Sequence, residues 1–237
     1  AILILFYIIM AQMVIILLPR ARVCIRRMEE VLKTEPQIRD PEDGLRGTWE
    51  DTREVLRFEN VSFRFSDAEE NTLKNISFSC RRGETTAIIG STGSGKSTIA
   101  RLILRFHDVS QGRILLKGRD LCRLPQKDLR RQLSYVPQKA WLFSGTIGEN
   151  LAHGKENAGK EEMLHALEIA QADFVKNLPQ GLETRVAQGG TNFSGGQKQR
   201  LCIARALMKY SDLYIFDDSF SALDFKTDKA LRDALKE

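Results

Sequence analysis

Hydrophobic residues fill almost all of the first eighteen positions, from Ala1 to Leu18, where Gln12 is the only strongly polar residue. As a helix this segment would be roughly 27 Å long, close to the thickness of a bilayer core. No basic region precedes it and arginines follow it, which argues against a secretory signal peptide. A buried soluble helix is the alternative, but such helices seldom lack a polar face. We expect residues 1–18 to be the C-terminal part of a transmembrane helix.

The next segment keeps a helical pattern and then loses its apolar residues. Apolar residues recur at helical spacing as far as Leu32, and Pro36 ends the pattern. Residues 35–54 are rich in proline, glycine and charge, which is typical of a linker. Residues 19–54 are therefore predicted to be a cytoplasmic helix extension and linker. The cytoplasmic side is indicated by the basic residues after the apolar segment, which are Arg20, Arg22, Arg26 and Arg27.

The pattern changes at Val55, where a folded domain is expected to begin. Apolar residues alternate over 55–65 and again over 73–78, which predicts half-buried antiparallel strands. Two continuous apolar runs, Thr85 to Ile89 and Leu213 to Phe216, are separated by helical patterns. Such strands are typical of a parallel sheet that is buried on both faces. The pattern predicts an α/β fold.

Composition adds little to this division. The chain of 237 residues is 42% hydrophobic and 28% charged, with a formal net charge of +5. A basic balance permits nucleic-acid binding, but the arginine cluster beside the apolar segment favours a membrane explanation. The four cysteines form no CxxC or Cys/His pattern, so neither a zinc site nor a disulfide framework is indicated.

A phosphate-binding loop follows the first apolar run. Its glycines would let backbone N–H groups approach phosphates, and the helix that follows would add its positive end. Lys96 would reach the β- and γ-phosphates, and the Ser97 hydroxyl would bind Mg²⁺. The loop predicts nucleotide binding, and GTPases, kinases and motor ATPases share it. Its residues are Gly90, Ser91, Thr92, Gly93, Ser94, Gly95, Lys96, Ser97 and Thr98.

Four further motifs follow in a fixed order. They are Tyr135-Val-Pro-Gln138, Phe193-Ser194-Gly195-Gly196-Gln197, Leu213-Tyr-Ile-Phe-Asp217-Asp218 and Ser221-Ala-Leu-Asp224. With the phosphate loop, they resemble the Q-loop, signature, Walker B strand and D-loop of ABC ATPases. The resemblance covers residues 55–237 and implies a P-loop NTPase of the ABC type. Such a domain has a parallel core sheet, an antiparallel β subdomain and a helical subdomain.

The resemblance also implies the site residues for ATP and Mg²⁺. Asp217 would hold Mg²⁺ through water, and Ser97 and Gln138 would be its other protein ligands. Phe65 would stack on the adenine, although a phenylalanine in an alternating strand is more often part of a core. The signature residues would contact the ATP of a partner domain rather than this chain's own; they are Ser194, Gly195, Gly196 and Gln197.

One position departs from the family pattern. Asp218 stands where competent ABC ATPases have a glutamate that activates the attacking water together with Gln138. Its carboxylate is one methylene shorter, which withdraws it by up to about 1.5 Å. The resemblance then implies one half of a heterodimeric exporter with a weakly hydrolytic site, or a homodimer with slow turnover. The family's switch histidine is expected beyond Glu237, so the domain is expected to be truncated.

The exporter subtype is indicated by residues 138–150 and 188–194, and by the apolar segment that precedes the ATPase. The resemblance implies an ATPase in the cytoplasm, joined to a multi-pass domain in the cell membrane. Its partner would be a second half-transporter, and its cargo a small molecule, lipid or peptide. A soluble ABC ATPase acting on DNA or ribosomes is the alternative, but it predicts no membrane span, and we expect no nucleic-acid partner. A regulatory half that seldom hydrolyses ATP also stays open.

Overall fold

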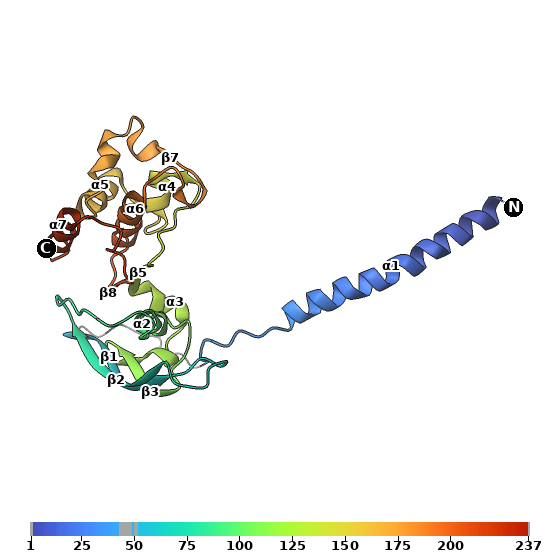
Figure 1. Cartoon of the computed structure of the whole chain (residues 1–237), viewed down its shortest axis with the longest axis horizontal. Coiled ribbons are helices and arrows are strands. Elements are labelled where there is room, and N and C mark those ends of the chain that lie inside the picture. Colours follow the sequence, from blue (N-terminus) through green and yellow to red (C-terminus); the bar gives the residue numbers. More distant parts are fainter. Residues whose placement is uncertain (1, 43–48, 50–51, 237) are drawn as a thin grey trace. The chain divides into compact units, whose positions relative to one another are not determined.

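The computed structural model describes residues 2–42, 49 and 52–236. Ala1, Glu237 and residues 43–48 and 50–51 of the predicted linker lie outside the described residues. The chain forms two compact units, Ala1–Arg39 and Asp40–Glu237. Both units appear in Figure 1.

The first unit consists mainly of one helix, α1 (Ile2–Leu32), which contains Pro19. Its described side chains are all exposed, although most are apolar. Its most apolar stretch has a mean hydropathy of 2.7, and among the described residues it is the one helix long and apolar enough to cross a membrane. The predicted continuation of the apolar segment into the arginine-rich segment as one helix is confirmed.

The second unit begins with an antiparallel sheet in the order β2-β1-β3-β4. β1 (Glu54–Phe63) is central and pairs antiparallel with both β2 (Leu73–Arg81) and β3 (Gln111–Leu116), while β4 (Arg119–Asp120) pairs with β3. The predicted antiparallel strands are thus confirmed. The alternation is interrupted at Asn60, whose φ of 49° accompanies a register shift in both ladders of β1.

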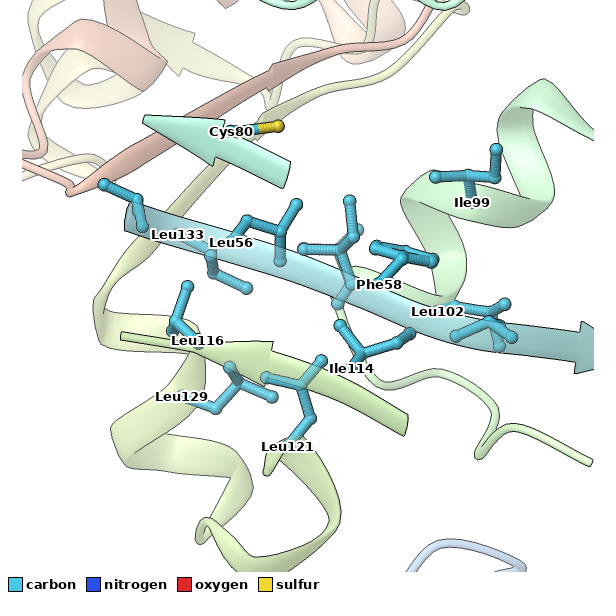
Figure 2. Close-up of a cluster of buried hydrophobic side chains, with 14 of the residues drawn as sticks. Leu56, Phe58, Cys80, Ile99, Leu102, Ile114, Leu116, Leu121, Leu129 and Leu133 are labelled. Atoms are coloured by element: carbon cyan, nitrogen blue, oxygen red, sulfur yellow. The ribbon is translucent and has the colours of Figure 1, made fainter. Parts of the chain in front are cut away.

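A first hydrophobic core fills the space between this sheet and two helices, α2 (Lys96–Ile103) and α3 (Gln126–Arg131). Figure 2 shows side chains of β1, β3 and both helices meeting there, with Phe58 near the middle. Phe58 also stacks on Phe78 of β2, with ring centroids 4.5 Å apart. This core holds α2 against the sheet, and with it the loop that begins the helix.

A short parallel sheet joins β5 (Leu133–Val136) to β8 (Leu213–Phe216) in full register. The second of the two predicted apolar strands is therefore confirmed. The first is not, because Thr85 to Ile89 form no strand and Ile89 is 92% exposed. Apolar composition favours burial, but a strand also needs a hydrogen-bonded neighbour, and no described strand pairs with this segment.

A second hydrophobic core lies around α6 (Gly195–Leu207). The signature lies at the start of α6, and further elements lie around the same core. They are α4 (Ile147–Ala152), α5 (Lys160–Ile169), α7 (Phe225–Ala234), β6 (Gly145–Thr146) and β7 (Arg185–Val186). Figure 1 labels α4, α5, α7 and β7 near α6. Short 3₁₀ helices span Leu121–Arg123, Asp173–Asn177, Gly181–Glu183 and Gln188–Gly190.

Candidate functional site

The phosphate loop takes its shape from two glycines in the left-handed region. Gly93 has φ 82° and Gly95 has φ 89°, conformations that other residues rarely adopt. Gly95 is the N-cap of α2 and has no side chain with which to accept from the first-turn N–H groups. The Lys96 ammonium donates to the carbonyls of Gly90 at 2.8 Å and Ser91 at 2.7 Å. The loop therefore curls around a cation at a helix start, an arrangement that suits phosphate.

Asp217 lies directly after β8 and is held by two hydroxyl groups. Ser97 Oγ donates to Asp217 Oδ1 at 2.8 Å, and the Tyr135 hydroxyl donates to Oδ2 at 3.2 Å. The backbone N–H of Asp217 donates to the carbonyl of Val136 at 3.0 Å. Burial, and then the negative charge of Asp217, raises the pKa of Tyr135, so its hydroxyl stays a donor at neutral pH. The parallel β5–β8 pair thus brings Asp217 to the first turn of α2.

Gln138 and Asp218 form a second pair beside the first. Gln138 Nε2 donates to Asp218 Oδ2 at 3.1 Å, and both residues are exposed. Asp218 has φ 50°, which aspartate tolerates better than most residues. The Ser221 hydroxyl donates to the Asp218 carbonyl at 2.9 Å. Four predicted site residues from three separate motifs therefore meet at one end of the parallel sheet.

The oxygen atoms gathered here suit a hard cation. The oxygen atoms of a hydroxyl, a carboxylate and an amide can bind Mg²⁺, which usually completes its coordination shell with phosphate oxygens and water. Within the part of the chain that the structure describes, no cluster of three or more His, Cys, Asp or Glu residues is present. The hydroxyl, carboxylate and amide fit an Mg²⁺ ion whose other ligands are phosphate oxygens and water.

Phe65 lies beyond the end of β1 in an aromatic cluster. Its half-buried ring meets Phe63 edge-to-face at 4.8 Å and His107 at 5.3 Å. These contacts fix the ring, and its contact with adenine stays a prediction.

The predicted signature begins α6 with a capping box. Gln197 N donates to Ser194 Oγ at 3.3 Å, and Ser194 N donates to Gln197 Oε1 at 2.9 Å. A Cβ on Gly195 would meet nothing within 4 Å, whereas one on Gly196 would lie 3.1 Å from the Ala222 carbonyl. The signature thus touches the Ser221–Asp224 turn, and Gly195 and Ser194 face solvent.

One contributor to the site was not singled out from the sequence. Tyr135 stands three residues before Gln138, within the motif that identified the glutamine. Its place on β5 beside β8 makes it a donor to Asp217, and only the pairing of those strands reveals this.

Comparison with known proteins identifies the family. The family model described as ABC transporter matches residues 73–221. The chain belongs to the ABC transporter family. An uncharacterized ABC transporter ATP-binding protein of Mycobacterium tuberculosis is 43% identical over 244 residues, which cover 99% of this chain and 40% of that protein. The ATP-dependent lipid A-core flippase of Chromobacterium violaceum is 41% identical, over 83% of this chain and 34% of its own length.

A solved structure agrees with these relatives. A bacterial Atm1-family ABC exporter with ATP bound has a TM-score of 0.86 and 37% identity, covering 96% of this chain and 40% of that chain. The predicted α/β ABC ATPase fold, preceded by a long helix, is confirmed. The chain spans about 40% of the length of the M. tuberculosis relative and of the Atm1-family exporter.

Proposed function

We propose that this chain is the ATP-binding and ATP-hydrolysing part of a membrane exporter. The main support is the hydrogen bond between Ser97 and Asp217, which belong to different motifs and are 120 positions apart in the sequence. A phosphate loop and a strand-end acid in contact form the arrangement that nucleotide phosphates and Mg²⁺ require. In this proposal the loop from Gly90 to Thr98 binds the phosphates and Phe65 stacks on the adenine.

Bound Mg²⁺ would neutralise charge on the β- and γ-phosphates. Ser97 would bind it directly, and Asp217 would bind through water and orient the Ser97 hydroxyl. Gln138 would turn its amide oxygen toward the ion. Lys96 would exchange its two carbonyl partners for phosphate oxygens, because a phosphate carries a negative charge that attracts the ammonium and a carbonyl does not.

The site's own hydrolysis is proposed to be weak. Asp218 Oδ2 accepts from Gln138 Nε2 at 3.1 Å, and the short side chain of Asp218 would hold the carboxylate back from an attacking water. A displacement of about 1 Å can cost about a hundredfold in rate. This supports one half of a heterodimeric exporter, and within it a mainly regulatory role for this site.

A partner domain would receive the signature of this chain. Ser194, Gly195 and Gly196 would direct backbone N–H groups of α6 at the γ-phosphate held by a second half-transporter. The solvent-facing Ser194 and Gly195 support this role, because their contacts leave the helix start accessible.

The apolar helix supports a place in the cell membrane. An exposed helix whose most apolar stretch has a mean hydropathy of 2.7 is unsuited to water, which opposes a soluble ATPase acting on DNA or ribosomes. The ATPase unit would lie in the cytoplasm, and the cargo would be a small molecule, lipid or peptide. By their names, the similar proteins include a lipid A-core flippase and an Atm1-family exporter.

The first experiment tests nucleotide binding. Lys96→Ala in the full protein that contains this chain, reconstituted in lipid, should weaken binding of a fluorescent ATP analogue at this site at least about a hundredfold. Lys74→Ala is the matched control, because Lys74 pairs with Glu70 on the surface and should be silent. Unchanged affinity in a folded Lys96→Ala protein would refute the proposal.

A second experiment compares the signature, which would serve the partner's ATP, with Asp218, which would serve this chain's own ATP. Gly196→Asp would put a carboxylate beside the partner's γ-phosphate, so ATPase activity and transport should collapse. Asp218→Asn should be much milder, and Asp218→Glu should raise activity by restoring reach. Equal loss in Gly196→Asp and Asp218→Asn would make Asp218 a working catalytic base.

A further inference from the structure

Trp49 belongs to the predicted linker, yet its side chain packs against the first hydrophobic core. It is half-buried, and two cations lie over its ring, Lys117 Nζ at 5.9 Å and Arg119 Cζ at 5.4 Å from the centroid. The ring quadrupole attracts such cations, and more strongly where water is excluded. The linker is therefore attached to the domain at this point.

The indole nitrogen reaches the start of the parallel sheet. In the amide orientation that satisfies both of its neighbours, Gln132 accepts from Trp49 Nε1 at 3.2 Å and donates to Asp212 Oδ2 at 2.5 Å. Gln132 is the residue before β5, and Asp212 is the residue before β8. Trp49 thus contacts the point from which both strands begin.

Asp212 and Gln132 tie the two strands together there. The Gln132 carbonyl accepts from the backbone N–H groups of Asp212 at 3.0 Å and Leu213 at 3.2 Å. The Asp212 carboxylate forms an ion pair with the buried Lys117 at 2.5 Å, the same lysine that lies over the Trp49 ring. Indole, amide, carboxylate and ammonium form one connected group, which we name the Trp49 clasp. Such networks fix geometry more firmly than their separate bonds.

A second linker contact is made at the start of α3, the helix that precedes β5. Asp40 Oδ1 accepts from Gln126 N at 2.9 Å and from Gln126 Nε2 at 3.2 Å, at the start of α3. α3 runs directly into Gln132. Asp40 contacts the first residue of α3, and Trp49 contacts Gln132, which directly follows α3. The linker is thus attached at both ends of the helix that leads to β5.

We infer that Trp49 is a positioning residue that holds the start of β5 and β8, and thereby places Gln138 and Asp217 for Mg²⁺. The inference rests on the proposed function. Each strand has only four residues, about 13 Å, so a shift at its start reaches its end. Neither strand carries the phosphate loop, so the clasp acts through Gln138 and Asp217, and the loop is linked to it through the hydrogen bond between Ser97 and Asp217.

The test uses the full protein that contains this chain, in lipid, and follows hydrogen exchange of its peptides with ATP in EDTA and with ATP and Mg²⁺. In Trp49→Ala, the Mg²⁺ concentration that protects residues 133–138 and 213–218 from hydrogen exchange should rise about tenfold. Residues 90–98 should keep their wild-type protection by ATP in EDTA. Trp49→Phe keeps a ring over the cations but lacks the N–H donor, and should lie between.

Gln132→Leu breaks the same link from the other side, so it serves as the second variant if Trp49→Ala fails to fold. Tyr210→Ala is the control, because it also removes a ring near a lysine, with Lys155 Nζ 5.3 Å from the centroid. Unchanged Mg²⁺ dependence in Trp49→Ala, or equal loss at the loop and the strand ends, would overturn the inference. Absence of ATP protection at 90–98 in the unaltered protein would instead refute the proposed function.

Discussion

The two sides of the proposed ATP site are built in opposite ways. On the loop side, residues 90–94 are exposed, and the described hydrogen bonds of the Lys96 ammonium go to carbonyls of its own loop. On the strand side, backbone hydrogen bonds join β5 to β8, and Asp217 has a hydroxyl donor on each carboxylate oxygen.

This difference shows where the geometry is prepared before any ligand binds. The strand side is preorganised, because each polar atom of the Asp217 carboxylate already has a partner. The loop side is shaped by glycine conformations, and its lysine must change partners when phosphate binds. Binding energy is therefore used to order the loop, whereas on the strand side Asp217 needs little rearrangement.

The largest expected effect comes from removing the centre of the strand side. Asp217→Ala should abolish the Mg²⁺-dependent part of ATP binding, a loss of about a hundredfold, and leave two hydroxyl groups without their acceptor. The orphaned donors should lower stability by about 1–3 kcal/mol. Titration of a fluorescent ATP analogue with and without Mg²⁺, and thermal unfolding, measure both effects.

Asp233→Ala is the control for that change, because Asp233 forms a surface pair with Lys236 at 3.3 Å. If Asp217→Ala weakened binding equally in EDTA and in Mg²⁺, the assignment of Asp217 to the metal side would be wrong.

A matched pair of glycines probes the loop side. Gly93 and Gly95 both have positive φ, so alanine strains either by about 1 kcal/mol. A Cβ on Gly93 would meet nothing within 4 Å, but one on Gly95 would lie 2.7 Å from Leu73 Cδ2 and 3.3 Å from the Thr72 carbonyl. Gly95→Ala should therefore lower stability by about 2–3 kcal/mol, and Gly93→Ala by about 1.

Denaturant unfolding without nucleotide, followed by ATP-analogue titration, measures that pair. Both variants should bind ATP more weakly, since the loop must keep its shape to receive phosphate. Equal stability of the two would mean that the contact with β2 does not constrain the loop.

Sequence reasoning predicted the members of the site better than their supports. Ser97 and Asp217 were assigned to one metal from their motifs, and they lie in contact. Thr85 to Ile89 were expected to form a strand because they are apolar, but apolarity does not supply a neighbour. Tyr135 and Trp49 were missed for the same reason, because each acts through a partner that only the pairing of β5 with β8 brings near.

A smaller effect tests one support of the strand side. Tyr135→Phe removes the donor to Asp217 Oδ2 and should cost about 0.5–1.5 kcal/mol, with a few-fold loss of Mg²⁺-dependent affinity. Tyr214→Phe is the matched control, since that hydroxyl on β8 donates at 2.8 Å to the Lys209 carbonyl instead.

The pKa of Tyr135 gives that test a second measurement. Because the folded pKa is raised, the contribution of the neutral hydroxyl is fully present below the usual tyrosine value near 10 and is lost as pH rises through the folded value. The difference between Tyr135→Phe and the unaltered protein should thus stay constant from about pH 7 to 9. A difference that shrinks across this range would mean that the hydroxyl ionises there.

The smallest expected effect lies where the linker meets α3, on the way to the strand side. A backbone hydrogen bond from Gln126 is the main cause that lowers the pKa of Asp40 below 3.8. The charged form therefore adds stability above the usual aspartate pKa, and this is lost as pH falls through the folded value. Asp40→Asn should lower the free energy of unfolding by about 0.3–1 kcal/mol at neutral pH and leave it unchanged once the unaltered side chain is protonated.

Asp128→Asn is the control, because Asp128 lies in the first turn of the same helix and pairs with Arg131 at 3.6 Å. Asp128 lies at the same helix start, but no hydrogen bond to it from Gln126 is described, so its replacement leaves the bond between Asp40 and Gln126 in place. Thermal unfolding from about pH 7 down to 3 separates the two variants. Equal curves for both would mean that Asp40 acts only as a surface charge and does not hold the linker against α3.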